Sequence, residues 1–336
     1  MSVLVVLAGA SCADETGPPA LGPLTQGAPP AGFPGETLLE TAPADNTLTE
    51  ARAALGRRLF FEPMLSRTST VSCASCHDPA RAFSDPAPVS TGVDGRRGTR
   101  NAPALVNLAW GRSFFWDGRA ATLEEQVGQP IENPLEMDLP LARAVERLSE
   151  DASYARAFAG AYGGPPSELT LRKALASFLR VLVSGASPYD RHMRGDDRAW
   201  SDAAGRGERL FFGEGAACFH CHVVGRLTNE GFFNNGSFVM GADEGREALT
   251  GRSGDRGKFK VPGLRNVAAS GPYMHDGSLL TLDEVLAQYN AGGRGDPSTD
   301  PQIRPLGLSA EQLADLLAFL RALSDEDFLS ERRFRL

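Results

Sequence analysis

Two copies of one cysteine pattern constrain this chain more than any other feature. The spacing Cys-x-x-Cys-His occurs at residues 73–77 and again at 218–222, with its thiols at Cys73, Cys76, Cys218 and Cys221. Only five cysteines and five histidines occur in 336 residues, so two such pentamers are not expected by chance. The pattern is typical of haem attachment, in which two thioether bonds fix the porphyrin and the adjacent histidine binds the iron. We therefore predict two haem c groups, with His77 and His222 as axial ligands.

Other uses of these cysteines fit the sequence less well. A zinc site would need four thiolate or imidazole ligands converging on one ion, whereas each cysteine pair here has its own histidine. Thioredoxin-like redox chemistry is less favoured still. The chain has 34 basic and 42 acidic residues, which argues against nucleic-acid binding. Its longest apolar run, Val3–Ala10, is far shorter than the roughly 20 residues of a membrane helix.

The N-terminal region has features of an export signal followed by a linker. Haem c is attached outside the cytoplasm, so we expect a signal peptide at residues 1–12 and a periplasmic protein. Two interpretations stay open: a lipoprotein signal with a lipid anchor at Cys12, or an ordinary cleaved signal behind a misplaced start codon. The absence of Lys and Arg before Arg52 weakens the first. Residues 13–46 hold seven Pro and five Gly, so we expect a disordered linker there.

The rest of the chain is an internal repeat. Residues 103–127 match residues 262–286 at a constant offset of 159, with nine identities in 25 positions. Arg-Leu-Phe-Phe precedes both cysteine motifs, and Phe-Leu-Arg recurs in two amphipathic helices near residues 178 and 319. The order helix, motif, long loop, helix predicts a mainly α protein. We expect two cytochrome c-like domains with long irregular loops, at residues 47–195 and 200–336.

The repeat allows the two expected haem pockets to be compared. No histidine lies between His77 and His192, so the first haem lacks a local imidazole as sixth ligand. Extending the offset of 159 places Pro130 opposite Tyr289, and proline cannot bind iron. We expect an open first haem and a second haem closed by Tyr289. Met274 and Met240 stay open as alternative ligands of the second iron.

An open haem beside a closed one suggests that the first binds a small oxidant and the second passes electrons. Cleavage of peroxide needs a group that moves a proton between its two oxygens. Glu136 is the acidic candidate, and Gln126 is a candidate hydrogen-bonding partner for the bound oxygen. On the sequence alone, a solvated carboxylate is the ordinary interpretation of Glu136.

Several motifs together resemble the bacterial di-haem cytochrome c peroxidases, including the MauG type, over about residues 50–325. Besides the two haem motifs they are Arg100–Pro103, Phe115–Arg119, Asn133–Met137 and Gly271–Gly277. The resemblance implies a peroxidatic first haem and an electron-transfer second haem. It implies that Trp116 lies between them, and that Glu136 and Gln126 belong to the distal pocket.

The resemblance also implies a calcium ion between the haems. Its ligands would map to Asn101, Ser270 and Pro272, a set of oxygen donors that suits Ca²⁺.

Two positions depart from ordinary members of that family. Val93 stands where they carry a distal histidine, and Tyr289 stands where they ligate the second iron with methionine. Both changes match the MauG type. A phenolate stabilises high oxidation states of iron, so the second haem of such a protein can hold an oxidising equivalent.

The function we expect from the sequence is a periplasmic peroxidase that reduces H2O2 to water at the first haem. Electrons would arrive through the second haem from a small cytochrome c or cupredoxin. One alternative is a MauG-like oxidase that modifies a protein or organic substrate. Others are a non-catalytic electron-transfer cytochrome, which would need two six-coordinate haems, and a haem-based sensor. A homodimer is an expectation from the family resemblance only.

Overall fold

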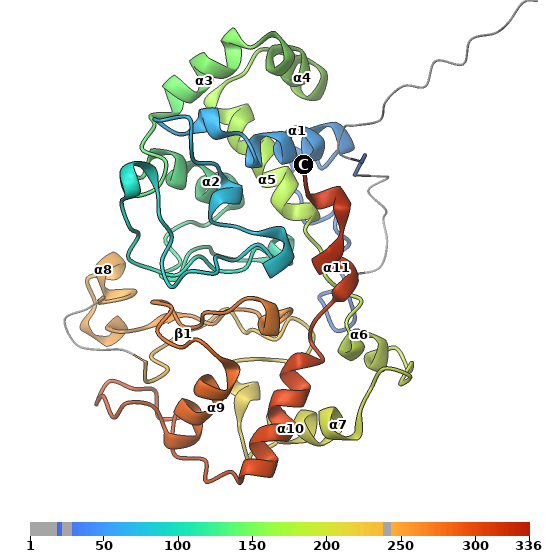
Figure 1. The fold of residues 1–336 in the computed structure, drawn as a ribbon, viewed down its shortest axis with the longest axis vertical. Coiled ribbons are helices and arrows are strands. Elements are labelled where there is room, and N and C mark those ends of the chain that lie inside the picture. Colours follow the sequence, from blue (N-terminus) through green and yellow to red (C-terminus); the bar gives the residue numbers. More distant parts are fainter. Residues whose placement is uncertain (1–18, 22–28, 238–242) are drawn as a thin grey trace, which may run out of the picture.

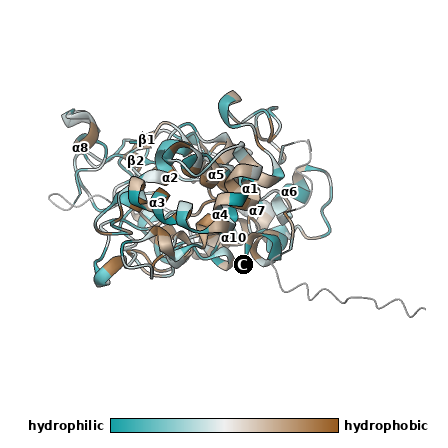
Figure 2. Cartoon of the chain, turned by 90° about the horizontal axis from the view of Figure 1, so that it is seen from above, coloured by the Kyte–Doolittle hydropathy of each residue, from teal (hydrophilic) through white to brown (hydrophobic). Residues whose placement is uncertain are grey.

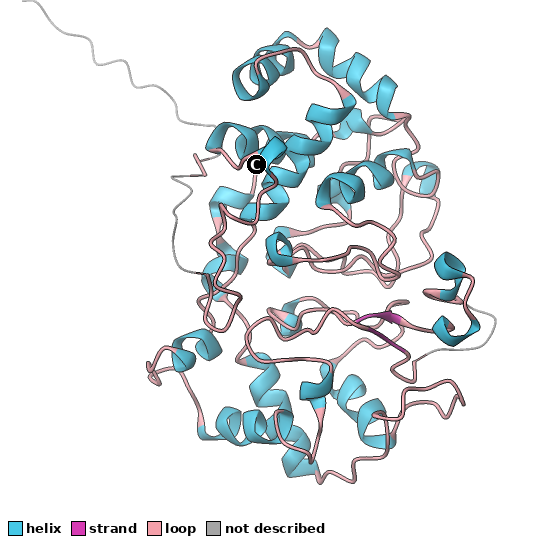
Figure 3. Ribbon diagram, turned by 180° about the vertical axis from the view of Figure 1, so that it is seen from behind, coloured by secondary structure: helices cyan, strands magenta, loops and turns pink. Residues whose placement is uncertain are grey.

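The computed structural model describes residues 19–21, 29–237 and 243–336. The expected signal peptide, Cys12 and Met240 lie outside the described residues. Two helical halves are stacked along the long axis, and their irregular loops face each other across the middle of the molecule (Figures 1 and 3). Within the described part, no helix has the length and apolar character needed to cross a membrane.

The elements are mostly helices, which confirms the mainly α fold of two cytochrome c-like halves. The helices of the first half are α1 Glu50–Phe60, α2 Leu123–Glu132, α3 Leu141–Glu150, α4 Ala152–Tyr162 and α5 Glu168–Val181. Those that follow are α6 Pro188–Met193, α7 Asp202–Phe211, α8 Glu247–Thr250, α9 Leu282–Ala291, α10 Ala310–Arg321 and α11 Glu326–Ser330. The strands β1 Phe232–Phe233 and β2 Phe259–Lys260 pair antiparallel.

Each half is built on one pair of tightly crossing helices, α1 with α5 and α7 with α10. Gly56 on α1 lies so close to α5 that a Cβ there would meet the Ala174 carbonyl oxygen at 2.0 Å. Gly207 on α7 would meet the Asp315 carbonyl oxygen of α10 at the same 2.0 Å. Glycine is therefore needed at both crossings, because any side chain would push the helices apart.

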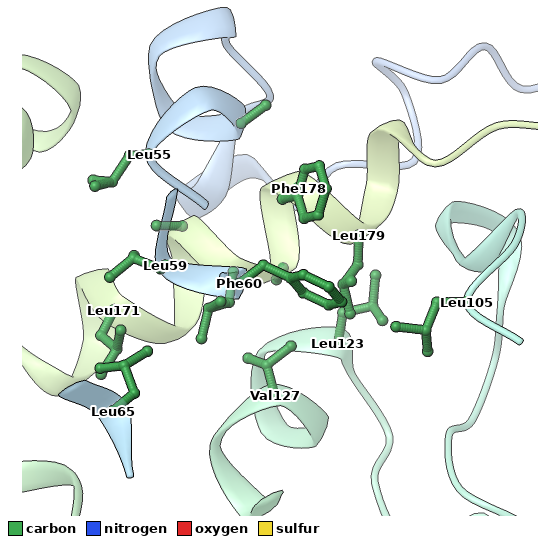
Figure 4. Close-up of a cluster of buried hydrophobic side chains, with 14 of the residues drawn as sticks. Leu55, Leu59, Phe60, Leu65, Leu105, Leu123, Val127, Leu171, Phe178 and Leu179 are labelled. Atoms are coloured by element: carbon green, nitrogen blue, oxygen red, sulfur yellow. The ribbon is translucent and has the colours of Figure 1, made fainter. Parts of the chain in front are cut away.

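The helices are amphipathic, with hydrophobic and hydrophilic residues on the same ribbons (Figure 2), and their apolar faces form two cores. In the first half, Leu59 and Phe60 of α1 pack with Leu171, Phe178 and Leu179 of α5 (Figure 4). The second core is centred on α7 and α10. The burial of these apolar faces holds each helix pair together.

The sequence repeat is also a structural repeat. α2 and α9 begin and end at positions exactly equivalent at the offset of 159, and both are N-capped by threonine, Thr122 and Thr281. Asn107 and Asn266 both adopt the left-handed backbone conformation, with φ of 58° and 59°. Identical capping and turn residues thus give each half the same helix beside its haem motif.

The segment before α1 differs from the disordered linker that the sequence predicted at residues 13–46. Residues 29–46 do not behave as a disordered linker, because they pack against the body of the protein. Phe33 contacts the Trp110 ring edge-on at a centroid distance of 4.9 Å, and Trp110 Nε1 donates to the Glu36 carbonyl oxygen at 3.1 Å. Leu38 and Leu39 pack on the first core. Proline and glycine content predicted disorder, but these apolar side chains provide the burial that offsets the cost of ordering.

The packing also crosses the predicted domain boundary in both directions. Tyr189 of α6, placed in the first half by sequence, is fully buried in the second core. Asp190 beside it pairs with buried Arg265 at 2.6 Å. Conversely, Phe328 and Phe334 near the C-terminus belong to the first core. Each half therefore contributes residues near its C-terminal end to the core of the other half.

Candidate active site

A cavity of about 1000 Å³ lies between the two halves and contains both haem motifs. Cys76 and His77 line it from the first half, and Cys218, Cys221 and His222 line it from the second. Its volume is at the top of the range of about 300–1,000 Å³ for ordinary ligand pockets. The cavity is thus large enough for bulky cofactors.

The two motif histidines are held in the same way. His77 Nδ1 lies 2.6 Å from the Phe83 carbonyl oxygen, and His222 Nδ1 lies 2.8 Å from the Leu227 carbonyl oxygen. Donation from Nδ1 leaves Nε2 free for a metal and fixes the plane of the ring. Burial lowers the pKa of both histidines, that of His222 to about 4, so both rings are neutral at pH 7 as metal ligands must be.

The donor groups of this cavity fit two haem c groups. Each motif brings two cysteine side chains together, the groups that thioether attachment of haem c uses. Phe60 and Phe211 occupy equivalent places, with ring centroids 6.3 Å from His77 and 6.2 Å from His222. Each motif therefore combines two thiols, an oriented imidazole and an aromatic wall.

In the first half, α2 and the loop after it bring the predicted distal residues to the cavity. Gln126, Pro130 and Glu136 all line it. Gln126 Oε1 is buried and has no hydrogen-bond partner among the described residues, so it is available to a ligand. Asn133 Nδ2 donates to Glu136 Oε1 at 2.6 Å.

The environment of Glu136 perturbs its acidity. Burial raises the pKa of its carboxyl group, while the Asn133 hydrogen bond and the charge of Arg119 oppose that rise. A carboxyl group with a raised pKa is suited to proton transfer nearer neutral pH. This environment contradicts the interpretation of Glu136 as a fully solvated carboxylate.

Val93 supplies no ligand to the cavity but supports the Glu136 loop. Its side chain is buried, and its amide donates to the Glu136 carbonyl oxygen at 2.8 Å. Gly92 lies so close to this loop that a Cβ there would meet the Leu135 carbonyl oxygen at 2.2 Å. In ordinary members of the family that the sequence resembles, this loop is expected to carry a distal histidine. In this chain the loop instead fixes the backbone of Glu136.

In the second half, Tyr289 and Met274 converge on one side chain. Asn235 Nδ2 lies 3.0 Å from the Tyr289 hydroxyl oxygen and 3.3 Å from Met274 Sδ. Burial raises the pKa of Tyr289 to about 12 in the absence of a metal charge. Both candidate ligands therefore face the same part of the cavity. Asn235 has no motif, and sequence reasoning missed it.

Trp116 lines the cavity that contains both haem motifs. Its Nε1 donates to the Asn101 carbonyl oxygen at 2.8 Å, and its own carbonyl oxygen accepts from the Lys260 amide at 2.7 Å. The Asn101 amide in turn donates to the His275 carbonyl oxygen at 2.7 Å. Trp116 is therefore held by backbone contacts from both halves.

The residues predicted to bind calcium line the same cavity. They are Asn101, Ser270 and Pro272. Asn101 Nδ2 donates a hydrogen bond to the Pro88 carbonyl oxygen at 3.1 Å. Oδ1 is therefore the atom of this side chain that could coordinate a cation. Among the residues that the structure describes, no group of three or more His, Cys, Asp or Glu side chains is arranged to hold a metal ion. A cation here would depend on amide and carbonyl oxygens.

Arg100 forms an ion-pair network between the halves that sequence reasoning did not assign. Its Nη1 lies 2.6 Å from Asp117 Oδ2, and its Nε lies 2.6 Å from Asp243 Oδ2. Asp117 follows Trp116 directly, so this network anchors the Trp116 loop to the second half. The one indication of this role in the sequence was that Arg100 begins the Arg100–Pro103 motif.

These features define a di-haem c-type cytochrome whose two halves bring different side chains to the shared cavity, Pro130 from α2 and Tyr289 from α9. The comparisons identify the family. The model of the di-haem cytochrome c peroxidase family matches residues 50–198, and the cytochrome c model matches residues 204–324. The chain is 42% identical to the methylamine utilization protein MauG of Methylorubrum extorquens over 288 residues, covering 84% of this chain and 81% of that protein.

Two further relatives support the assignment. A cytochrome-c peroxidase of Denitromonas iodatirespirans is 34% identical, with 96% of this chain and 91% of that protein covered. The crystal structure of a MauG-like protein associated with microbial copper homeostasis superposes with a TM-score of 0.82 at 34% identity, covering 94% of this chain and 98% of that chain. The chain belongs to the MauG and di-haem cytochrome c peroxidase family, and it is an oxidoreductase with two cytochrome c domains.

Proposed function

We propose that this protein is a peroxidase that reduces H2O2 to water at the first haem pocket. The reaction consumes two electrons and two protons for each peroxide and yields two molecules of water. The observation that carries the proposal is the contrast between the pockets. Among described residues of the first half that line the cavity, His77 alone is a His, Met or Tyr, whereas Tyr289 and Met274 both line the second pocket.

When bound, the first haem supplies the iron that binds peroxide and exchanges electrons with it. The residues of this chain supply the proton transfer. Glu136 accepts a proton from one peroxide oxygen and returns it to the other, and the free Gln126 Oε1 accepts a hydrogen bond from the bound peroxide. The Val93 amide, which donates to the Glu136 carbonyl oxygen, and the Asn133 side chain, which donates to Glu136 Oε1, keep this carboxylate at the cavity.

His77 and His222 are the proposed axial ligands, and the four motif cysteines are the proposed covalent attachment points. Tyr289 is the proposed sixth ligand of the second iron. Trp116 is the proposed path for electrons between the haems, since it lines the cavity that contains both motifs.

We also propose a calcium ion at Asn101, Ser270 and Pro272. Asn101 contributes a side-chain oxygen, and its carbonyl oxygen holds the Trp116 indole. A cation there would stiffen the segment that positions Trp116.

Electrons would come from a small cytochrome c or cupredoxin in the periplasm. The peroxidase relatives support a peroxide substrate and a cytochrome donor. The periplasmic location, a lipid anchor at Cys12 and a homodimer stay proposals from the sequence.

The test is steady-state consumption of H2O2 by the protein loaded with both haems, with a reduced small cytochrome c as electron donor. We expect two donor molecules to be oxidised per peroxide consumed. Peroxide consumption that requires an organic co-substrate, with no donor oxidation, would contradict the proposal.

A MauG-like oxidase is the second candidate, and the pairing of Pro130 with Tyr289 favours it. The 42% identity to a MauG protein points the same way. The same assay distinguishes the two functions, because an oxidase would turn over an organic or protein substrate without a reduced cytochrome.

A further inference from the structure

The C-terminal tail, residues 325–336, comes after the second haem domain in sequence but packs on the first. α11 lies beside the first half, and the C-terminus ends next to α1 (Figure 1). Phe328 is 5% exposed and belongs to the core of the first half. The tail therefore contributes buried side chains to the core of the first half.

The start of the tail is fixed by Asp325, a buried carboxylate at the junction of the halves. Its Oδ2 accepts three hydrogen bonds of 2.9 Å, from the Ser184 hydroxyl and the amides of Gly185 and Ala186. Its amide donates to Asn266 Oδ1 at 2.7 Å, in the repeat of the second half. Asp325 Oδ1 also caps α11 by accepting from the Phe328 amide. The place of Phe328 is thus set by contacts with both halves.

Phe328 packs on Phe83, the residue that holds the first axial histidine. The two ring centroids are 6.2 Å apart, and Phe83 is fully buried. Its backbone is left-handed, with φ of 60°, which is unfavourable for a bulky residue unless its surroundings hold it. In this conformation the Phe83 carbonyl oxygen accepts from His77 Nδ1 at 2.6 Å.

A comparison of the residues around His77 and His222 shows which contact occurs only at the first haem. Phe60 and Phe178 around His77 correspond to Phe211 and Phe319 around His222, with ring centroids 5.3 Å and 5.0 Å apart. The acceptor for His222 is the carbonyl oxygen of Leu227, also left-handed with φ of 54°. At the first haem the acceptor residue is instead Phe83, and its aromatic ring packs on Phe328 of the tail.

We propose that the C-terminal tail positions the proximal ligand of the first haem, with Phe328 holding Phe83 so that its carbonyl oxygen keeps a short hydrogen bond to His77. This inference rests on the proposed function of the first haem as the site of peroxide reduction. The hydrogen bond from a ligating imidazole sets its basicity and therefore the electron density at the metal. In this proposal Phe328 is a positioning residue, because it acts on His77 through Phe83.

The test compares Phe328→Ala, Phe328→Leu and Phe334→Ala in the full chain loaded with both haems. Phe334 is the matched control, because it lies in the same tail and packs on Phe328 at 5.5 Å, one ring further from Phe83. The readouts are the midpoint potential of each haem and the iron–histidine stretching frequency from resonance Raman spectroscopy. Haem content and Tm are measured alongside.

We expect Phe328→Ala to raise the potential of the first haem and lower its iron–histidine frequency, because a weaker hydrogen bond makes His77 a weaker donor. The second haem should not shift, and Phe328→Leu should restore part of the effect. An unshifted first haem in Phe328→Ala, or an equal shift in Phe334→Ala, would overturn the proposal. If Phe328→Ala does not retain haem, Phe328→Leu against Phe334→Ala decides by the same criterion. A wild-type protein without peroxide turnover would overturn the proposed function but leave these shifts measurable.

Discussion

The two haem pockets share one framework but differ on the side opposite the motif histidine. α2 and α9 start at equivalent threonine caps, and both motif histidines donate to the carbonyl oxygen of a left-handed residue. On α2, however, the position facing the cavity is Pro130, and on α9 it is Tyr289. The two halves therefore orient the motif histidine in the same way, while the equivalent position on α2 and α9 differs, and this difference is the basis for proposing an open first pocket and a closed second one.

The largest expected effect comes from removing the proposed proton carrier of the first pocket, Glu136. Glu136→Gln should lower peroxide turnover by about 10²–10⁴-fold, the usual contribution of a positioned acid–base group. Stopped-flow and steady-state kinetics measure the loss. Glu132→Gln is the matched control, since Glu132 is exposed on α2 and should leave the rate unchanged. Equal rates in wild type and Glu136→Gln would remove Glu136 from the mechanism.

The same variant tests the direction of the pH dependence. Burial raises the pKa of Glu136, and in the proposed mechanism its carboxylate form accepts the proton from peroxide. Turnover should therefore rise with pH through a pKa above that of an ordinary glutamate, and this limb should vanish in Glu136→Gln. A limb that persists in the variant would assign the titration to another group.

The second pocket should open when its proposed ligand is removed. Tyr289→Phe should convert the second haem to an open iron, so electron paramagnetic resonance would show two open haems per chain instead of one. Tyr162→Phe is a control for hydroxyl loss in the other half, away from this pocket. A spectrum of Tyr289→Phe identical to wild type would favour Met274 as the ligand.

The helix crossings should respond alike in the two halves. Gly56→Ala and Gly207→Ala each place a methyl group against a backbone carbonyl, at an unrelaxed 2.0 Å. Overpacking of this kind costs about 1–3 kcal/mol, measured as the free energy of unfolding in denaturant. Gly160→Ala is the control, because nothing lies within 4 Å of a Cβ there. Unequal costs at the two crossings would show that the halves are not equivalent in packing.

The smallest expected effect is a spectral change of the second haem alone. Asn235→Ala removes an amide shared by Tyr289 and Met274, and the loss of a hydrogen bond costs about 0.5–1.5 kcal/mol. The absorption spectrum should shift for the second haem only. Glu311→Ala, in the same half and exposed at the start of α10, should leave both spectra unchanged. A shift in the first haem would contradict the separation of the pockets.

The repeat explains why much of the fold was predictable from sequence. The haem motifs and the residues shared at the offset of 159 specify local structure, so α2, α9 and their caps follow from them. Pro130 and Tyr289 could be compared for the same reason. Glu136 was found through its motif, but its burial could not be read from the sequence.

The contacts between halves were not predictable in this way. Phe328 and Phe83 lie far apart in sequence without a shared motif, and so do Arg100 and Asp243. Composition was misleading for residues 29–46, because Phe33 packs on Trp110 despite the surrounding Pro and Gly. Such pairings depend on how whole domains dock, which periodicity and spacing do not encode.

The most direct test of the central claim is rapid mixing of the fully ferric protein with one equivalent of H2O2, followed by absorption. The claim of an open first pocket and a closed second one predicts an immediate spectral change without prior reduction of either haem. No reaction until one haem has been reduced would contradict it, and would mean that another side chain closes the first iron.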